Sequence, residues 1–265
     1  MMESTSMPVL FVGHGSPTNA LENNEFTKKW YEIGQSFAKP KAILCISAHW
    51  ETQGTQVTSM DNPRTIHDFG GFQKELYDMQ YPAKGSSSLA LQTKELVKST
   101  TLVLDQNWGL DHGCWSVLCK MYPDASIPVV QLSLDYNKPA QYHFDLAKEL
   151  LLLRKLGILI VASGNIVHNL RLISIQSMSN INTEYGFDWA KEANEQIKKL
   201  IVEENFSELI HYSNLGKAVQ LAIPTPEHYL PLLYALSLKS KNEKLTFFND
   251  KLIAGSLSMT SIVIQ

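Results

Sequence analysis

The sequence predicts a single α/β domain over residues 7–265, in which helices flank a central mixed, largely parallel sheet. Short apolar runs with the character of buried strands alternate with longer segments whose apolar residues recur at helical spacing. Three of the apolar runs are also followed closely by a histidine. Because ligand sites in open α/β sheets form beyond the carboxyl ends of the strands, we expect the active site at that edge.

The strands are expected where short apolar or β-branched runs lie between turn-forming residues. Pro128 leads into one of these runs, and Gly157 restarts another. The last run is expected to pair in antiparallel orientation. In chain order, the expected strands are residues 7–13, 41–48, 55–60, 101–104, 129–134, 158–163, 245–248 and 256–264.

The helices are predicted from apolar residues that fall on one helical face. In the first helix these include Phe26, Trp30 and Ile33, and Pro40 follows its end. Asp188 is expected to act as the N-cap of a later helix. The expected helices are residues 25–37, 86–99, 138–155 and 188–203, a short helix to about 212, and 229–238.

Three polar loops separate these elements at residues 61–72, 107–115 and 222–228. The first contains Pro63 and a Gly-Gly pair, which argue against regular structure there. Each loop carries at least one histidine, so the loops as well as the strand ends supply candidate site residues.

The composition fits an ordinary globular enzyme and excludes several classes of partner. A net charge of −3 gives no electrostatic reason to expect nucleic acid or an anionic membrane as a partner. The sequence has no apolar stretch of about eighteen residues and no signal-peptide pattern, so we expect a cytoplasmic protein. Cys45, Cys114 and Cys119 are odd in number and lack CxxC spacing, which favours free thiols over disulfides or a thiolate zinc site.

Five of the eight histidines stand at positions that favour a role in the active site. Three follow apolar runs, one opens a helix after Pro-Thr-Pro-Glu, and one lies in a loop with two tryptophans that suits a flat substrate. In the order of this description they are His14, His49, His168, His228 and His112. His67 is expected to pair with the adjacent Asp68, whereas His143 and His211 are expected to be surface residues.

Imidazoles gathered in one crevice suggest a divalent metal ion. The preferred ligands are His14, His49 and His228, an all-histidine set, with His168 as a further ligand or an acid/base group. Such a set binds zinc at least as well as iron, and the spacing does not choose between them. Glu227 adjoins His228, but neighbouring residues at a helix start point in different directions, so we expect only one of them to face the metal.

Six motifs at these positions resemble the class III extradiol ring-cleavage dioxygenases, and they are most similar to the 4,5-DOPA dioxygenase extradiol branch. They occur in the same order and with comparable spacing from about residue 7 to the C-terminus. The motifs are Gly13-His14-Gly15-Ser16-Pro17, Ser47-Ala48-His49-Trp50, His67-Asp68-Phe69-Gly70-Gly71-Phe72, Leu110-Asp111-His112-Gly113, Gly164-Asn165-Ile166-Val167-His168-Asn169-Leu170 and Pro224-Thr225-Pro226-Glu227-His228.

The resemblance implies an α/β enzyme that uses non-haem Fe²⁺, often with Zn²⁺ found in the same site, to open a DOPA-like catechol with O₂. It implies that His14, His49 and His228 bind the metal and that His168 is a fourth ligand or a nearby acid/base. His112 would line the substrate pocket and is a second candidate for acid/base catalysis.

Other functions also fit a chain that begins with a strand and Gly-His-Gly-Ser. A tetrapyrrole metal chelatase is one, although Pro17 stands where chelatases usually have arginine. A zinc hydrolase requires only three histidines and a bound water. A metal-binding protein without catalytic activity is the remaining alternative. The sequence makes no prediction of the oligomeric state.

Overall fold

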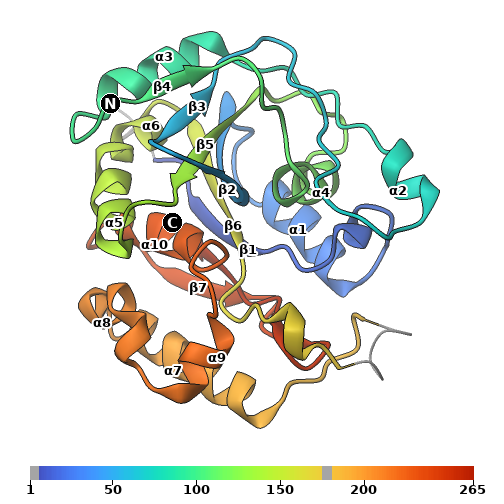
Figure 1. Cartoon of the computed structure of the whole chain (residues 1–265). Coiled ribbons are helices and arrows are strands. Elements are labelled where there is room, and N and C mark those ends of the chain that lie inside the picture. Colours follow the sequence, from blue (N-terminus) through green and yellow to red (C-terminus); the bar gives the residue numbers. More distant parts are fainter. Residues whose placement is uncertain (1–5, 175–180) are drawn as a thin grey trace.

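A computed structural model describes residues 6–174 and 181–265 (Figure 1). Its main feature is an eight-stranded sheet with the strand order β4-β3-β5-β2-β6-β1-β10-β7. A separate two-stranded ribbon contains β8 and β9. The strands are β1 Val9–Gly13, β2 Ala42–Thr52, β3 Gln56–Thr58, β4 Val103–Asp105, β5 Val129–Asp135, β6 Ile158–Gly164, β7 Leu245–Phe248, β8 Leu252–Ile253, β9 Leu257–Ser258 and β10 Ser261–Ile264.

The sheet is mixed but largely parallel, as the sequence predicts. The central strands β5, β2, β6 and β1 pair in parallel. Antiparallel pairing joins β10 to β1 and β7, and β3 to β5. Every residue of β1, β5 and β6 is buried, which is typical of parallel strands covered by helices on both faces.

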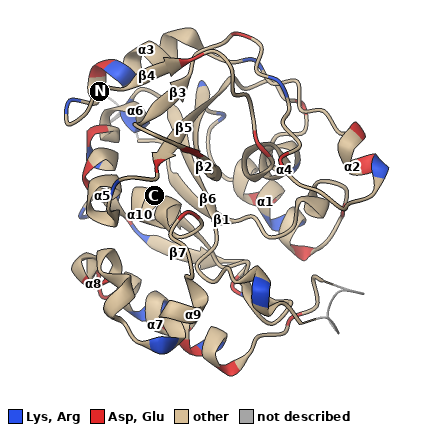
Figure 2. Ribbon diagram, in the orientation of Figure 1, with Lys and Arg blue, Asp and Glu red and all other residues tan. Residues whose placement is uncertain are grey.

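Helices cover both faces of the sheet. The described helices are α1 Glu25–Gln35, α2 Lys74–Asp78, α3 Ser87–Leu96, α4 His112–Met121, α5 Ala140–Glu149, α6 Leu151–Lys155, α7 Asp188–Val202, α8 Phe206–Ile210, α9 Lys217–Ala222 and α10 Leu230–Ser237. Alternate residues of β1 enter two different cores: Leu10 packs with α1 and α4, and Phe11 packs with α5 and α10. Lys, Arg, Asp and Glu are interspersed on the outer helices and loops (Figure 2). Within the described ranges, no helix has the length and apolarity needed to span a membrane.

The strand that carries His49 is longer than predicted. The expected strand ends at residue 48, whereas β2 continues to Thr52. Ile46 pairs with Leu132 and Glu51 pairs with Leu134, so β2 bulges away from β5 between these positions. His49 therefore lies within the bulge rather than beyond the strand. Bulges of this kind redirect side chains and occur often beside active sites.

The predicted end of the loop 107–115 is wrong. Helix α4 already begins at His112, so the last four residues of that range are helical. Asp111 is the N-cap, and its carboxylate accepts a hydrogen bond from the N–H of Cys114 at 3.1 Å. Most residues of α4 are buried, including those from His112 to Leu118. A helix buried on nearly all sides shows no polar face, so the pattern of its sequence does not reveal it.

The expected helix 138–155 is two helices. Pro139 is the N-cap of α5, and the chain tightens at Leu150, whose N–H bonds to the carbonyl of Ala147 before α6 begins. The expected strand 256–264 is also divided into β9 and β10. Met259 interrupts it, because its N–H bonds to the carbonyl of Lys251 instead of continuing a ladder.

Three further expectations need correction. Asp188 is the first residue of α7, and Phe187 occupies the N-cap position, so Asp188 contributes a favourable charge rather than a cap. His228 lies in a turn before α10 rather than in its first turn. His143 is fully buried, and its Nδ1 lies 3.1 Å from the hydroxyl of Tyr234 because it faces inward from α5. His211 is exposed, as expected.

Candidate metal centre

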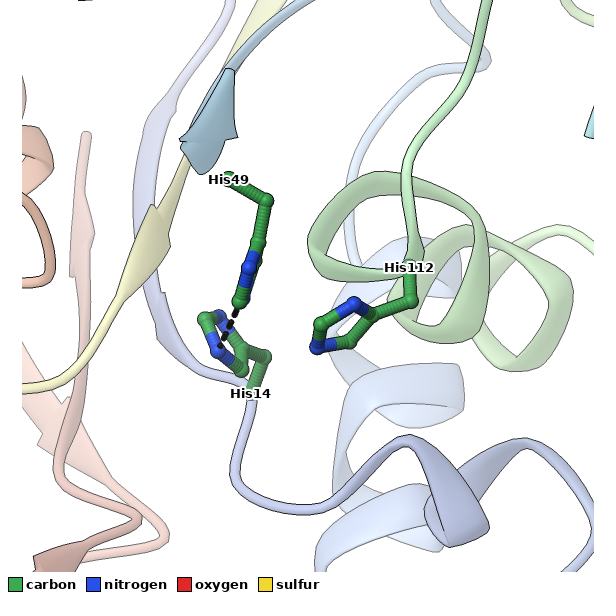
Figure 3. A group of neighbouring side chains, drawn as sticks. All are labelled: His14, His49 and His112. Atoms are coloured by element: carbon green, nitrogen blue, oxygen red, sulfur yellow. Dashed lines mark hydrogen bonds between the residues drawn. The ribbon is translucent and has the colours of Figure 1, made fainter. Parts of the chain in front are cut away.

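Five histidines from separate segments form one cluster at the carboxyl ends of the central strands. His14 follows β1, His49 lies in the bulge of β2, and His112 begins α4. Figure 3 shows the rings of these three residues turned toward one another. His168 follows β6, and His228 precedes α10. The structure thus brings together all five histidines that the sequence selects.

The ring distances show how compact the cluster is. The centroid of His14 lies 5.0 Å from that of His49 and 5.3 Å from that of His228, and the centroids of His49 and His228 are 4.9 Å apart. His112 is closer still to His49, at 3.8 Å. The candidate ligand atoms of His14, His49 and His112 all lie within 4.8 Å of one another, as do those of His168, Glu227 and His228.

His14 has its Nε2 lone pair directed into the cluster. Its Nδ1 lies 3.0 Å from the hydroxyl of Ser163. That hydroxyl donates its only proton to the carbonyl of Gly113, at 2.6 Å. Ser163 must therefore accept a hydrogen bond from Nδ1–H of His14. The Nε2 atom of His14 then carries a lone pair, and it lies 3.2 Å from Nε2 of His49 (Figure 3).

Asp68 orients the next two rings. Its Oδ2 atom lies 2.9 Å from Nδ1 of His112 and 3.4 Å from Nδ1 of His49. Burial alone would raise the pKa of Asp68, but hydrogen bonds from His112 and the proximity of His49 give a net lowering, so this carboxyl is ionised. An ionised carboxylate only accepts hydrogen bonds. The His112 ring therefore carries its proton on Nδ1 and a lone pair on Nε2. The nearby negative charge of Asp68 favours the same tautomer in His49.

In His228, as in His112, Nδ1 lies beside a carboxylate oxygen. Its Nδ1 lies 3.1 Å from Oε1 of the adjacent Glu227. Its Nε2 is buried and has no hydrogen-bond partner among the described residues. A buried polar atom without a hydrogen-bond partner needs an explanation, and coordination of a metal ion is one that suits a nitrogen among other imidazoles.

The donor set fits a metal ion. Histidine ligands of zinc commonly use their other ring nitrogen to donate a hydrogen bond to a carboxylate or another acceptor. In a tetrahedral zinc site with Zn–N distances near 2.0–2.1 Å, two ligand nitrogens lie about 3.3 Å apart. The 3.2 Å between the Nε2 atoms of His14 and His49 agrees with that separation.

The cluster also favours neutral imidazoles, which are the form that binds metals. Burial, followed by the neighbouring imidazoles, lowers the pKa of His14, His49 and His228 well below the usual value. For His49, the charge of Asp68 opposes this effect only in part. Burial and then His112 lower the pKa of His168 to about 4.

The ring of His168 lies parallel to that of one other site histidine. It stacks on the ring of His228, with centroids 3.4 Å apart and planes inclined by 6°. A metal ion binds an imidazole in the plane of the ring, along the lone pair. One ion cannot lie in both of two stacked parallel planes, so this arrangement disfavours His168 and His228 as ligands of the same ion.

Sequence reasoning missed the residues that support the ligands. The sequence predicts that Asp68 pairs with its neighbour His67, but Nε2 of His67 instead lies 3.0 Å from the carbonyl oxygen of Met79. Asp68 is 44 residues from His112 in the chain, and no local pattern reports that contact. Phe69 was also missed; its ring lies 5.6 Å from that of His112, edge to face.

Comparisons with known proteins identify the family of this chain. The family model described as the catalytic LigB subunit of aromatic ring-opening dioxygenase matches residues 6–259. A protein of Escherichia coli K12 named 4,5-DOPA dioxygenase extradiol is 47% identical over 100% of this chain and 97% of its own length. A protein of the same name from Beta vulgaris is 33% identical over 98% of this chain and 97% of its own length. The crystal structure of an uncharacterized protein from E. coli K12 is similar, with a TM-score of 0.83 and 42% identity, covering 98% of this chain and 100% of that one.

Proposed function

Because the chain belongs to the LigB family of aromatic ring-opening dioxygenases, we propose that it opens a catechol-type, DOPA-like substrate by extradiol cleavage with O₂. The names of the E. coli and Beta vulgaris relatives support the substrate class. The match to a ring-opening family supports this reaction over tetrapyrrole metal chelation, zinc-dependent hydrolysis or metal binding without catalysis.

The observation that carries the proposal is the common orientation of the clustered imidazoles. His14, His49 and His228 each have Nδ1 beside an acceptor oxygen. The Nε2 atoms of His14 and His49 face each other at 3.2 Å, and Nε2 of His228 is buried without a hydrogen-bond partner among the described residues. These three residues are the proposed ligands of a divalent ion, Fe²⁺ or Zn²⁺. When bound, Fe²⁺ would lower the pKa of a coordinated catechol and supply the redox chemistry that zinc lacks.

His168 is proposed as the acid/base group. Its stacking on His228 keeps it beside the ligands without sharing their ion. Burial lowers its pKa to about 4, so the ring is neutral and has a free lone pair, although it is a weaker base than an exposed histidine. His112 is proposed to face the substrate. Its Nδ1 is committed to Asp68, so Nε2 is the atom that can hydrogen-bond to a substrate oxygen.

Aromatic rings beside His112 are proposed to form one wall of the substrate site. Phe69 contacts His112 edge to face, and Phe72 and Tyr77 pack against Phe69 with centroids 5.4 and 5.2 Å away. Aromatic rings of this kind favour a flat substrate through offset or edge contacts. The free thiols of Cys45, Cys114 and Cys119 are consistent with the reducing cytoplasm, where we propose that the enzyme acts.

Anaerobic reconstitution with Fe²⁺, followed by addition of O₂ and L-DOPA, tests the proposal. We expect oxygen uptake and a yellow semialdehyde product, with both absent in His14→Ala and His49→Ala. A reconstituted wild type that consumes no oxygen with any catechol tried would contradict the assignment. Activity on esters or amides with Zn²⁺ and without oxygen would favour a hydrolase instead.

A further inference from the structure

The loop that carries Asp68 is fixed in place by contacts with the segment before α4. The N–H of Ile66 bonds to the carbonyl of Leu110 at 2.7 Å, and the N–H of Leu110 bonds to the carbonyl of Arg64 at 2.8 Å. The indole N–H of Trp115 donates to the carbonyl of Ile66 at 2.8 Å. These bonds hold the loop in one position above the start of α4, so the carboxylate of Asp68 has a defined place.

Asp68 contacts two site histidines through one carboxylate. Its Oδ1 accepts the backbone N–H of His112 at 2.8 Å, while Oδ2 faces Nδ1 of His112 at 2.9 Å and Nδ1 of His49 at 3.4 Å. The Asp68 side chain is 17% exposed, and those of His49 and His112 are 18% and 8% exposed. All three groups are thus largely shielded from water, which would otherwise compete for these contacts.

We propose that Asp68 is the positioning residue that couples the metal ligand His49 to the substrate-facing His112. Oδ2 of Asp68 is hydrogen-bonded to Nδ1 of His112 and lies 3.4 Å from Nδ1 of His49, so one negative oxygen favours the Nδ1–H tautomer and the observed orientation in both rings. The two Nε2 lone pairs are thereby presented to the centre of the cluster at the same time. This inference rests on the proposed metal site.

An amide at this position does not reproduce the arrangement. Asparagine offers one acceptor oxygen and one NH₂ donor group, whereas the three contacts of Asp68 require both side-chain oxygens as acceptors. Asp68→Asn keeps the size of the side chain, but with its oxygen on the backbone N–H of His112 it places an NH₂ group against Nδ1 of that ring. The ring contact is then lost, or the ring moves its proton from Nδ1 to Nε2. The substitution therefore affects His49 and His112 together and leaves the Ser163 contact of His14 untouched.

Zinc affinity, measured by competition with a chelator, tests the role of Asp68 without depending on catalysis. Support of a metal-bound histidine by its hydrogen-bond acceptor is worth about 10- to 100-fold in metal affinity, and we expect a loss of that size in Asp68→Asn. Asp61→Asn is the matched control, because Asp61 is exposed on the same loop and undergoes the same chemical change. Wild-type affinity in Asp68→Asn would overturn the proposal.

The nitrogen chemical shifts of the histidine rings give a second readout that a purely structural role would not move. In the zinc-loaded wild type, we expect His49 and His112 to report the Nδ1–H form, and in Asp68→Asn we expect both signals to change while that of His14 stays. Unchanged signals of His49 and His112 would refute the coupling.

If Asp68→Asn does not fold, Asp68→Glu replaces it in both measurements. Glutamate keeps the charge and displaces the oxygens, so the proposal again requires weaker zinc binding, and unaltered binding would contradict it. Ring cleavage by the Fe²⁺-loaded wild type decides the proposed function separately. Either proposal can fail while the other stands.

Discussion

His168 and His228 lie face to face, with ring centroids 3.4 Å apart and planes inclined by 6°. This stacking gives the two residues different roles although they are close in space. We expect the His228→Ala variant to lose most of the metal affinity of the wild type, because the substitution removes a proposed ligand. We expect His168→Ala to bind metal as the wild type does and to lose turnover, since acid/base catalysis typically contributes about 10²–10⁴-fold. Metal content and zinc affinity of both variants check this, and an equal loss in the two would make His168 a fourth ligand.

Ser163 is expected to matter for metal binding although it does not face the metal. Its hydroxyl accepts from Nδ1–H of His14 and donates to the carbonyl of Gly113. Ser163→Ala should lower zinc affinity by about 10- to 100-fold. Ser133→Ala is the control, because it removes a buried, hydrogen-bonded hydroxyl from the nearby strand β5. Equal zinc affinities in the two variants would show that the Ser163 contact does not orient His14.

Helix α4 packs so closely against His49 that a side chain larger than hydrogen at Gly113 would clash with it. A Cβ atom there would lie 2.5 Å from Oγ of Ser47 and 2.8 Å from Cδ2 of His49. Gly113→Ala should therefore displace the His49 ring and weaken metal binding. Gly70→Ala is the comparison, since a Cβ at Gly70 meets nothing within 4 Å. Chelator competition on both proteins measures the difference, and wild-type affinity in Gly113→Ala would count against the packing.

The burial of His143 is expected to make the free energy of unfolding depend on pH. Burial lowers its pKa to about 4, from the usual value near 6.5. Between these values the unfolded chain binds more protons than the folded one, so this contribution is fully present above pH 6.5 and is lost as the pH falls toward 4. The loss is on the order of 3 kcal/mol.

Urea unfolding at several pH values, on the wild type and on His143→Asn, isolates this contribution. The free energy of unfolding of the wild type should fall more steeply from pH 6.5 to pH 4 than that of the variant. The other histidines are common to both proteins and cancel in the comparison. Identical slopes would mean that His143 does not titrate in this range.

Loss of the ion pair between the buried Arg154 and Glu243 is expected to lower the stability of the fold, although the pair is not part of the metal centre. Its side chain is fully buried, donates to the carbonyls of Met7 and Leu238, and pairs with Glu243. Removing one partner of a buried pair typically costs about 3–5 kcal/mol, so we expect Glu243→Ala to lower the free energy of unfolding by about that amount. Lys29→Ala, which breaks an exposed pair with Glu32, should cost less than about 1 kcal/mol. Denaturant unfolding of both variants compares the two costs, and similar small losses would contradict the role of Arg154.

The sheet and the five site histidines could be predicted because they depend on local signals. A buried parallel strand is a short apolar run whatever its partners are, and the carboxyl ends of such strands meet at one edge. His14 and His168 could be placed beyond their strands on this basis. His49 was selected for the same reason, but its position inside a bulge depends on how β2 pairs with β5, which no local pattern reports.

The features that were missed depend on contacts between distant segments. Asp68 is identified only when its loop lies over α4, and α4 itself carries no polar face that would mark it as a helix. His143 stands among charged neighbours in the sequence, which suggests a surface position, yet the packing of α5 against α10 turns it inward. In each case the tertiary contact overrides the local pattern.

The central claim is that the Nε2 atoms of His14, His49 and His228 bind one metal ion. Anomalous diffraction from crystals of the protein loaded with Fe²⁺ or Zn²⁺, recorded at the absorption edge of the metal, tests it most directly. We expect a single peak within bonding distance of these three atoms, with His168 stacked on His228 and not bonded to the metal. A peak held instead by His168 and Glu227, or no peak among the histidines, would contradict the account.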